Sequence, residues 1–226
     1  ALPMLLYVKE RPKPKNISFE KTFKRIRQES VDSFKLLKRY REFLKFCVCG
    51  LFYQAGIAVV ITLSAVYAQL VMKFTTAQTI TLILVVNITA AIGAFVFGYV
   101  QDRLGHKKTL ALTILLWIIM GVMAAFSHGP VSFWIAANIA GIAMGSSQSA
   151  GRAVVAVFAP AGELAQFYSA WNVAVWGANV LGPITYGTVT WLTSGDQRTA
   201  ILVTTLFFVI GLLILRRVHL PSKTVC

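Results

Sequence analysis

The stretch from Gly98 to Lys108, GYVQDRLGHKK, separates two long apolar runs. Gly98 and Gly105 permit close backbone approach and a sharp reversal of the chain. Asp102 can face the positive end of a helix. Three cations complete the stretch, Arg103, Lys107 and Lys108. Because such cations form charge pairs and hold a loop on the cytoplasmic side, the stretch predicts a cytoplasmic turn between two membrane-spanning helices.

Apolar runs of about 20 residues, long enough to cross a bilayer core of about 30 Å, continue on both sides of this turn. They cover residues 46–70, 80–100, 109–126, 131–151, 166–192 and 199–215. The 226 residues are 57% hydrophobic and 13% charged, whereas about a quarter of the residues of a soluble domain are charged. The runs lack the alternation of membrane strands. The expected fold is therefore an all-α polytopic membrane protein with six transmembrane helices.

The net charge is +14, and the basic residues are distributed unevenly between the two sides of the predicted membrane. When residues 9–45 are placed in the cytoplasm, 20 of the 22 Lys and Arg residues lie inside and two, Lys73 and Arg198, lie outside. The C-terminus then also lies inside. Residues 9–45 carry apolar side chains at helical spacing among the cations, which indicates an amphipathic helix, either on the anionic membrane surface or against the bundle. Nucleic-acid binding is not expected.

These patterns divide the chain into four expected parts. The first, residues 1–8, is apolar and too short to span a membrane. Positive charges follow it rather than precede it, unlike in a signal peptide. We expect them to be the end of a preceding transmembrane helix. Residues 9–45 form a basic cytoplasmic central loop, residues 46–217 a six-helix transmembrane domain, and residues 218–226 a cytoplasmic tail.

The Gly98 to Lys108 stretch resembles the G-x-x-x-D-R-x-G-R-K loop motif of the major facilitator superfamily, with His106 where Arg is usual. That superfamily has twelve helices in two halves, and the motif follows the second helix of each half. The resemblance implies the C-terminal half of a twelve-helix bundle, with an N-terminal six-helix half as its partner. It also implies that the loop around Asp102 latches onto the other half and affects the inward/outward equilibrium, which makes the motif residues gating candidates.

Two further strings, GSSQSAGR at 145–152 and LGPITYG at 181–187, resemble the unknown major facilitator family, which includes vacuolar amino-acid effluxers. There the tenth helix reads G-x-x-Q-x-x-S-R-S and the eleventh ends in L-G-P-x-x-x-G. Gly151 and Ala153 replace the two serines beside Arg152. The resemblance implies a secondary active transporter that moves a small solute, an amino acid or related metabolite, by alternating access.

Polar side chains inside the apolar runs are candidates for the substrate pathway, because a polar group without a partner is costly in a bilayer. Tyr168, Asn172, Trp176, Asn179 and Pro183 recur at offsets of four, four, three and four residues and so form one stripe. Gln148 and Arg152, four residues apart, also share a helix face. The substrate-binding candidates are Gln54, Asn87, Gln148, Arg152, Tyr168, Asn172, Trp176 and Asn179.

Structural roles are the alternative for most of these candidates. Arg152 could hold a carboxylate or phosphate of the substrate, or reach the cytoplasmic boundary and pair with Glu163. The asparagines could form interhelical hydrogen bonds, and Trp176 could serve packing alone.

Other site types find little support in the sequence. No apolar run contains Asp or Glu, so a proton-coupling carboxylate would lie in the other half. Cys47 and Cys49 have no partner ligands, and Ser147 and Ser149 have no base within the membrane. We therefore expect no metal, no cofactor and no enzyme activity.

The expected partners are a small-molecule substrate, the lipid bilayer and the N-terminal half, and the expected location is the plasma (bacterial inner) membrane. The alternative function is a membrane scaffold or receptor with a degenerate transporter fold.

Overall fold

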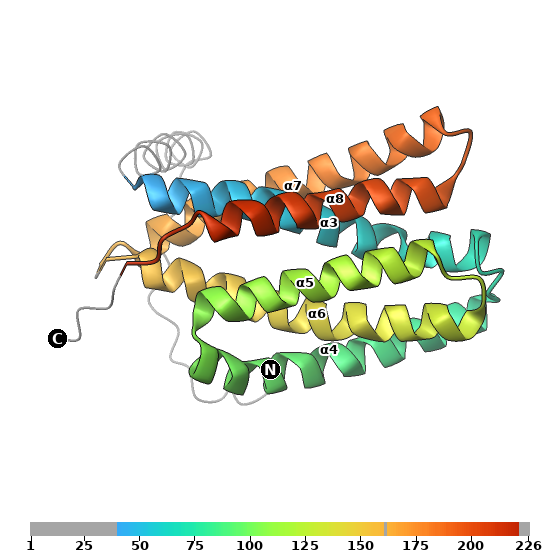
Figure 1. Cartoon of the computed structure of the whole chain (residues 1–226), viewed down its shortest axis with the longest axis horizontal. Helices are drawn as coiled ribbons and strands as arrows, with labels where there is room; N and C mark the ends of the chain where they lie inside the picture. Colours follow the sequence, from blue (N-terminus) through green and yellow to red (C-terminus); the bar gives the residue numbers. More distant parts are fainter. Residues whose placement is uncertain (1–39, 161, 222–226) are drawn as a thin grey trace, which may run out of the picture.

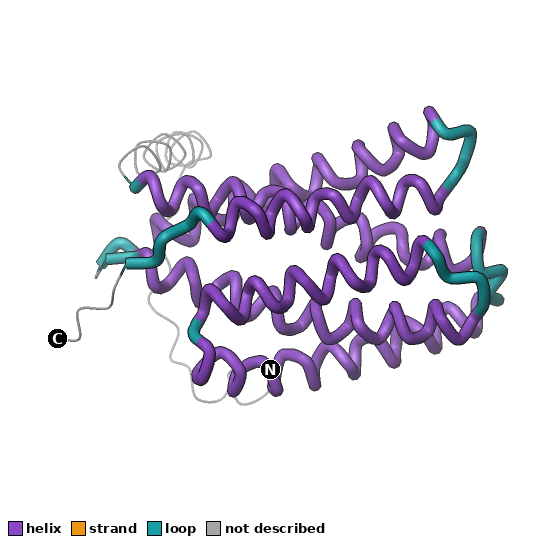
Figure 2. The backbone as a smooth tube through the Cα atoms, viewed as in Figure 1, coloured by secondary structure: helices purple, strands orange, loops and turns teal. Residues whose placement is uncertain are grey.

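The computed structural model describes residues 40–160 and 162–221. Within these ranges the chain forms six α-helices: α3 Arg41–Leu70, α4 Thr76–Leu104, α5 His106–Ala125, α6 Pro130–Phe158, α7 Leu164–Leu192 and α8 Gln197–Arg216. Each helix contains one predicted apolar run almost completely, so the six-helix prediction is confirmed. The connections between them are short (Figure 2). The predicted helix end at 1–8, the amphipathic segment and most of the tail lie outside the described residues.

The helices form two groups of three that lie side by side (Figure 1). In one group α3 packs on α7 and α8, and in the other α6 packs on α4 and α5. Contacts of α5 with α8 join the groups. The loop at Gly105 and the C-terminal end of α8 lie at the same end of the bundle (Figure 1), as a cytoplasmic placement of both requires.

Local sequence signals fix several helix ends. Thr75 and Gln78 form a capping box that starts α4. Gly105 has a φ of 81° between α4 and α5, a backbone conformation that favours glycine. At the opposite end of the bundle, Asp196 caps α8, and hydrogen bonds from the Thr199 hydroxyl and the Arg198 N–H lower the pKa of its carboxyl.

Glycines bring α4 and α6 into backbone contact. A Cβ on Gly141 would lie 2.6 Å from the Val86 carbonyl oxygen, and one on Gly145 would overlap the carbonyl oxygen of Ala90. In the opposite direction, a Cβ on Gly93 of α4 would lie 2.6 Å from the carbonyl oxygen of Ile142 in α6. Small residues are what allow membrane helices to pack this closely.

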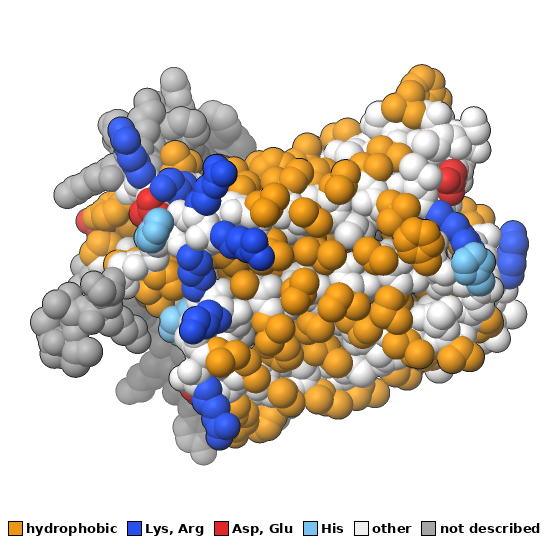
Figure 3. Space-filling model, in the orientation of Figure 1, with side chains coloured by type: hydrophobic (Ala, Val, Ile, Leu, Met, Phe, Trp, Pro, Cys, Tyr) orange, Lys and Arg blue, Asp and Glu red, His pale blue; other side chains and the backbone are white. Residues whose placement is uncertain are grey.

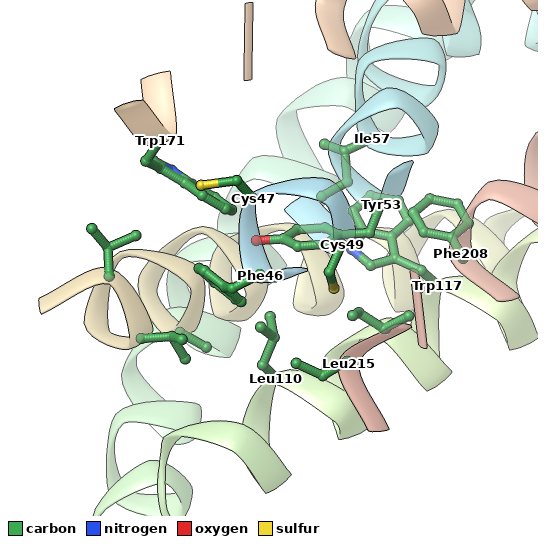
Figure 4. Close-up of a cluster of buried hydrophobic side chains, with 14 of the residues drawn as sticks. Phe46, Cys47, Cys49, Tyr53, Ile57, Leu110, Trp117, Trp171, Phe208 and Leu215 are labelled. Carbon is green, nitrogen blue, oxygen red and sulfur yellow. The ribbon is translucent and has the colours of Figure 1, made fainter. Parts of the chain in front are cut away.

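An aromatic core joins the two groups of helices (Figure 4). The rings of Trp117 and Phe208 stack at 5.2 Å between α5 and α8, and those of Phe46 and Trp171 stack at 5.0 Å between α3 and α7. Offset and stacked aromatic pairs add to simple packing. The thiol of Cys49 donates to the Gly211 carbonyl at 3.2 Å and links α3 to α8.

Four of the six helices, α3, α4, α5 and α8, are both long and apolar enough to cross a membrane by composition alone. The other two, α6 and α7, are 29 residues each, about 43 Å at 1.5 Å per residue, but polar side chains lower their mean hydropathy. An apolar belt covers the visible face of the bundle, and Lys and Arg gather at its left-hand end (Figure 3). The charge distribution therefore agrees with the predicted topology.

Ser147→Ala is expected to lower the free energy of unfolding by about 1 kcal/mol. Trp117 Nε1 donates to the Ser147 hydroxyl at 3.2 Å, and both residues are buried. The variant leaves the indole N–H without its partner. Ser149 of the same helix is exposed, so Ser149→Ala should change stability by less than about 0.5 kcal/mol. Unfolding curves in mixed micelles measure both variants, and equal losses would contradict a role for the Trp117 hydrogen bond.

Candidate substrate site

Four of the predicted substrate residues meet where α3, α6 and α7 approach one another. The Gln148 amide donates to the Gln54 side-chain oxygen at 3.3 Å and joins α6 to α3. The Tyr168 hydroxyl donates to the backbone oxygen of Arg152 at 3.0 Å and joins α7 to α6. Gln54 is 5% exposed, whereas Gln148 and Tyr168 are half-buried. The four residues thus form a polar cluster, with one buried amide and two partly open side chains.

Arg152 is the cation of this cluster. Its side chain is exposed, and its guanidinium has no ion pair in the part of the chain that the structure describes. In particular, no ion pair joins Arg152 to Glu163 in those residues, so the structural alternative raised by the sequence gains no support. The guanidinium remains available for an anionic group.

The stripe predicted on α7 also reaches the surface of the bundle. Asn172 and Asn179 are exposed, and Trp176 is 68% exposed. Among the described residues no hydrogen bond joins Asn172 or Asn179 to another helix, and most of the Trp176 side chain lies outside the packed part of the bundle. An exposed stripe of amides is unfavourable against lipid, so this face requires a cavity or a partner helix.

Asn87 lies apart from the cluster. Its side chain donates to the Ile83 carbonyl of its own helix at 2.8 Å, so it makes an intrahelical bond rather than the interhelical one that was its alternative role. It lines a cavity of about 260 Å³ between the two groups of helices, whose other lining residues are mainly apolar. The structure therefore separates Asn87 from the other seven candidates.

Tyr53 is a polar residue of the cluster that the candidate set omitted. It is fully buried, and its hydroxyl makes no hydrogen bond to a described residue, although the Gln54 side chain lies beside it. A Cβ on Gly151 would lie 2.5 Å from this hydroxyl. The glycine that replaces a family serine thus leaves room for the Tyr53 hydroxyl. Two signals in the sequence point to Tyr53: this glycine, and the place of Tyr53 beside Gln54 within the apolar run 46–70.

The loop motif forms the predicted turn. Gly105 makes the reversal, and a Cβ added at Gly98 would meet nothing within 4 Å. Asp102 and Arg103 are exposed and form no ion pair with any residue that the structure describes. These two charges are therefore free for a contact outside the six helices.

Lys107 has a different position from the other motif cations. Its ammonium donates to the carbonyl oxygens of Arg216 and Val218, at 3.1 and 2.6 Å. Arg216 is the last residue of α8 and Val218 lies two residues beyond it, so the cation satisfies carbonyls that lack partners within the helix. The sequence did not predict this contact. Lys108, one residue on, is exposed.

Within residues 40–160 and 162–221, no three His, Cys, Asp or Glu side chains lie close enough together to hold a metal ion. The thiols of Cys47 and Cys49 are buried in α3 among apolar side chains.

Known proteins resemble the chain along its whole length. Residues 1–225 match the family described as Vacuole effluxer Atg22 like. The Bacillus subtilis (strain 168) protein described as "Uncharacterized MFS-type transporter YxiO" is 27% identical over 226 residues, which cover 99% of this chain and 51% of that protein. The chain thus spans about half the length of this curated relative.

Solved transporters share the fold. The fucose:proton symporter FucP of E. coli superposes with a TM-score of 0.71 at 18% identity, over 97% of this chain and 52% of that one. The inward open xylose transporter XylE from E. coli superposes with a TM-score of 0.66 at 19% identity. This match covers 79% of the present chain and 47% of XylE. Both matches, like that to the Bacillus protein, cover about half of a major facilitator transporter. The chain therefore belongs to the Vacuole effluxer Atg22-like family of the major facilitator superfamily.

Proposed function

We propose that this chain is one half, the C-terminal one, of a secondary transporter that moves a small solute across a membrane by alternating access. The observation that carries the proposal is the exposed polar stripe of α7 beside the open Arg152. A second six-helix half facing this stripe would enclose a polar passage near mid-membrane, which is where substrates of such transporters bind.

The substrate that fits these groups is a small molecule with an anionic group and further polar atoms. The free guanidinium of Arg152 suits a carboxylate, and the amides of Gln148 and Asn172 can donate to it or accept from an ammonium group. An amino acid has both groups. The described helices offer no acid among these side chains, so a proton-coupling carboxylate would come from the other half.

Uptake into proteoliposomes tests the proposal. The native protein, reconstituted in a plasma-membrane lipid mixture, is given a panel of radiolabelled amino acids and related metabolites, with protein-free vesicles as the control. We expect at least one solute to accumulate or exchange above the control. Binding of a solute without any movement across the membrane would favour the scaffold or receptor function instead.

Asp102→Asn is expected to slow this transport about tenfold or more. With the basic end of the bundle in the cytoplasm, the free carboxylate would latch onto a helix of the other half and bias the inward/outward equilibrium. The amide keeps the size of the side chain and removes its charge. Transport rate at saturating solute measures the effect, and Asp196→Asn, at the opposite end of the bundle, is the matched control. Equal rates for the native protein and Asp102→Asn would exclude the latch.

A further inference from the structure

A groove between α5 and α8 combines three cations with an apolar floor. Its volume is about 390 Å³, and its cationic lining is Lys107, Lys108 and Arg216. The remaining six lining side chains are apolar, among them Leu112 and Leu212, and no acidic residue lines it. The groove lies away from the polar stripe on α7 and α6, so the proposed substrate passage does not explain it.

The groove is graded from charged to apolar along the helix axis. Lys108 and Arg216 lie at the basic end of the bundle, near the start of α5 and at the end of α8. Leu115 also lines the groove, seven residues further along α5, about 10 Å deeper at 1.5 Å per residue. An amphiphile with a charged head and an apolar tail matches this gradient.

Two of the three cations are free to bind an anion. Lys107 is engaged by the carbonyl oxygens that end α8. Lys108 and Arg216 are exposed, and neither forms an ion pair with another of the described residues. Lys and Arg side chains gather over this end of α5 and α8 in Figure 3.

The surface around the groove is of the kind that faces lipid. Leu112 and Leu115 of α5 are 37% and 43% exposed, and Leu213 of α8 is 54% exposed. Exposed aliphatic side chains on membrane helices contact acyl chains at no cost, unlike the amides of α7. An acyl chain can therefore cover this face.

From these observations we infer that the groove is a specific site for an anionic glycerophospholipid of the cytoplasmic leaflet, with its phosphate between Lys108 and Arg216 and an acyl chain along Leu115 and Leu212. Basic pockets between helices on the cytoplasmic side bind anionic head groups in this way, and each cation near such a surface contributes about 1 kcal/mol, or about fivefold in affinity.

Lipid titration of the purified native protein, followed by native mass spectrometry, tests the inference. We expect short-chain phosphatidylglycerol to bind at least about tenfold more tightly than phosphatidylcholine of the same chain length. The double variant Lys108→Gln/Arg216→Gln should weaken phosphatidylglycerol binding by about thirtyfold. The control Arg41→Gln/Arg217→Gln removes two exposed cations outside the groove lining and should leave binding unchanged.

Ala111→Phe provides a second arm that keeps every charge. Ala111 lines the groove, so the larger ring should exclude the acyl chain and weaken phosphatidylglycerol binding. The site would be overturned by equal binding of the two lipids, or by a control variant that loses as much phosphatidylglycerol affinity as the double variant. Displacement of the lipid by inorganic phosphate at matched concentration, or unchanged binding in Ala111→Phe, would also overturn it. If the double variant does not fold, the single variants Lys108→Gln and Arg216→Gln carry the same comparison.

Discussion

Gly145→Val is expected to abolish folding of the transmembrane domain or to lower its free energy of unfolding by at least about 3 kcal/mol. Even the first atom of the new side chain would overlap the carbonyl oxygen of Ala90, and the next contact, 2.8 Å to the Ala90 carbonyl carbon, is also backbone. Neither atom can move by changing a rotamer, so α4 and α6 must separate. Because this crossing holds α4 to the bundle, the loss extends beyond one contact.

Gly187→Val is the matched control for Gly145→Val. Gly187 also lies within a membrane helix, α7, but a Cβ added there would meet no atom of another helix within 4 Å. Its replacement should change stability by less than about 0.5 kcal/mol. Size-exclusion profiles and unfolding curves of the two variants give the comparison. Equal behaviour of the two would show that α4 and α6 are not in backbone contact at Gly145.

Arg152→Ala is expected to weaken the transporter's affinity for its solute by about tenfold or more, with expression unchanged. A hydrogen bond to a charged group contributes about 1.5–3 kcal/mol, and the guanidinium has no ion pair among the described residues that its removal would break. Gln148→Ala should act in the same direction through the loss of its amide. The half-saturation concentration for uptake measures both effects.

Arg217→Ala is the control for Arg152→Ala, since it removes an exposed cation at the same end of the bundle but outside the cluster. It should leave the half-saturation concentration as it is. Lost expression together with unchanged affinity in Arg152→Ala would instead assign Arg152 to the structure of the α6–α7 connection.

Apolar run length predicted each helix, but local chemistry fixed the ends. The fourth apolar run covers residues 131–151 and is followed by Arg152, yet α6 continues to Phe158. One cation does not end a helix, whereas Pro160 disfavours helical geometry at Ala159, which is extended with ψ 124°. In the same way, α4 begins at Thr76 rather than residue 80 because Thr75 caps it.

The sequence predicted only those parts of the candidate site that depend on spacing within a single helix. Spacing placed Gln148 and Arg152 on one face of α6 and the amides on one stripe of α7, because both relations lie within a single helix. It could not show that Gln148 bonds to Gln54, which is 94 residues away in the chain. The partners of Lys107 and the room that Gly151 leaves for Tyr53 also depend on packing between helices, which a single sequence does not encode locally.

Accessibility of mid-membrane positions on α7 tests most directly whether the stripe lines a substrate passage. In the native protein with Cys47, Cys49 and Cys226 replaced by alanine, a single cysteine is placed at Asn179, in the stripe, or at Ile184, which is 61% exposed. Ile184 lies five residues after Asn179, about 140° around the helix and so outside the stripe. We expect Asn179→Cys to react with a water-soluble maleimide and the transported solute to slow that reaction. Ile184→Cys should stay unreactive, because we expect its side of α7 to face lipid. Equal, solute-independent reactivity at the two positions, or none at Asn179→Cys, would contradict a passage between two halves at this face.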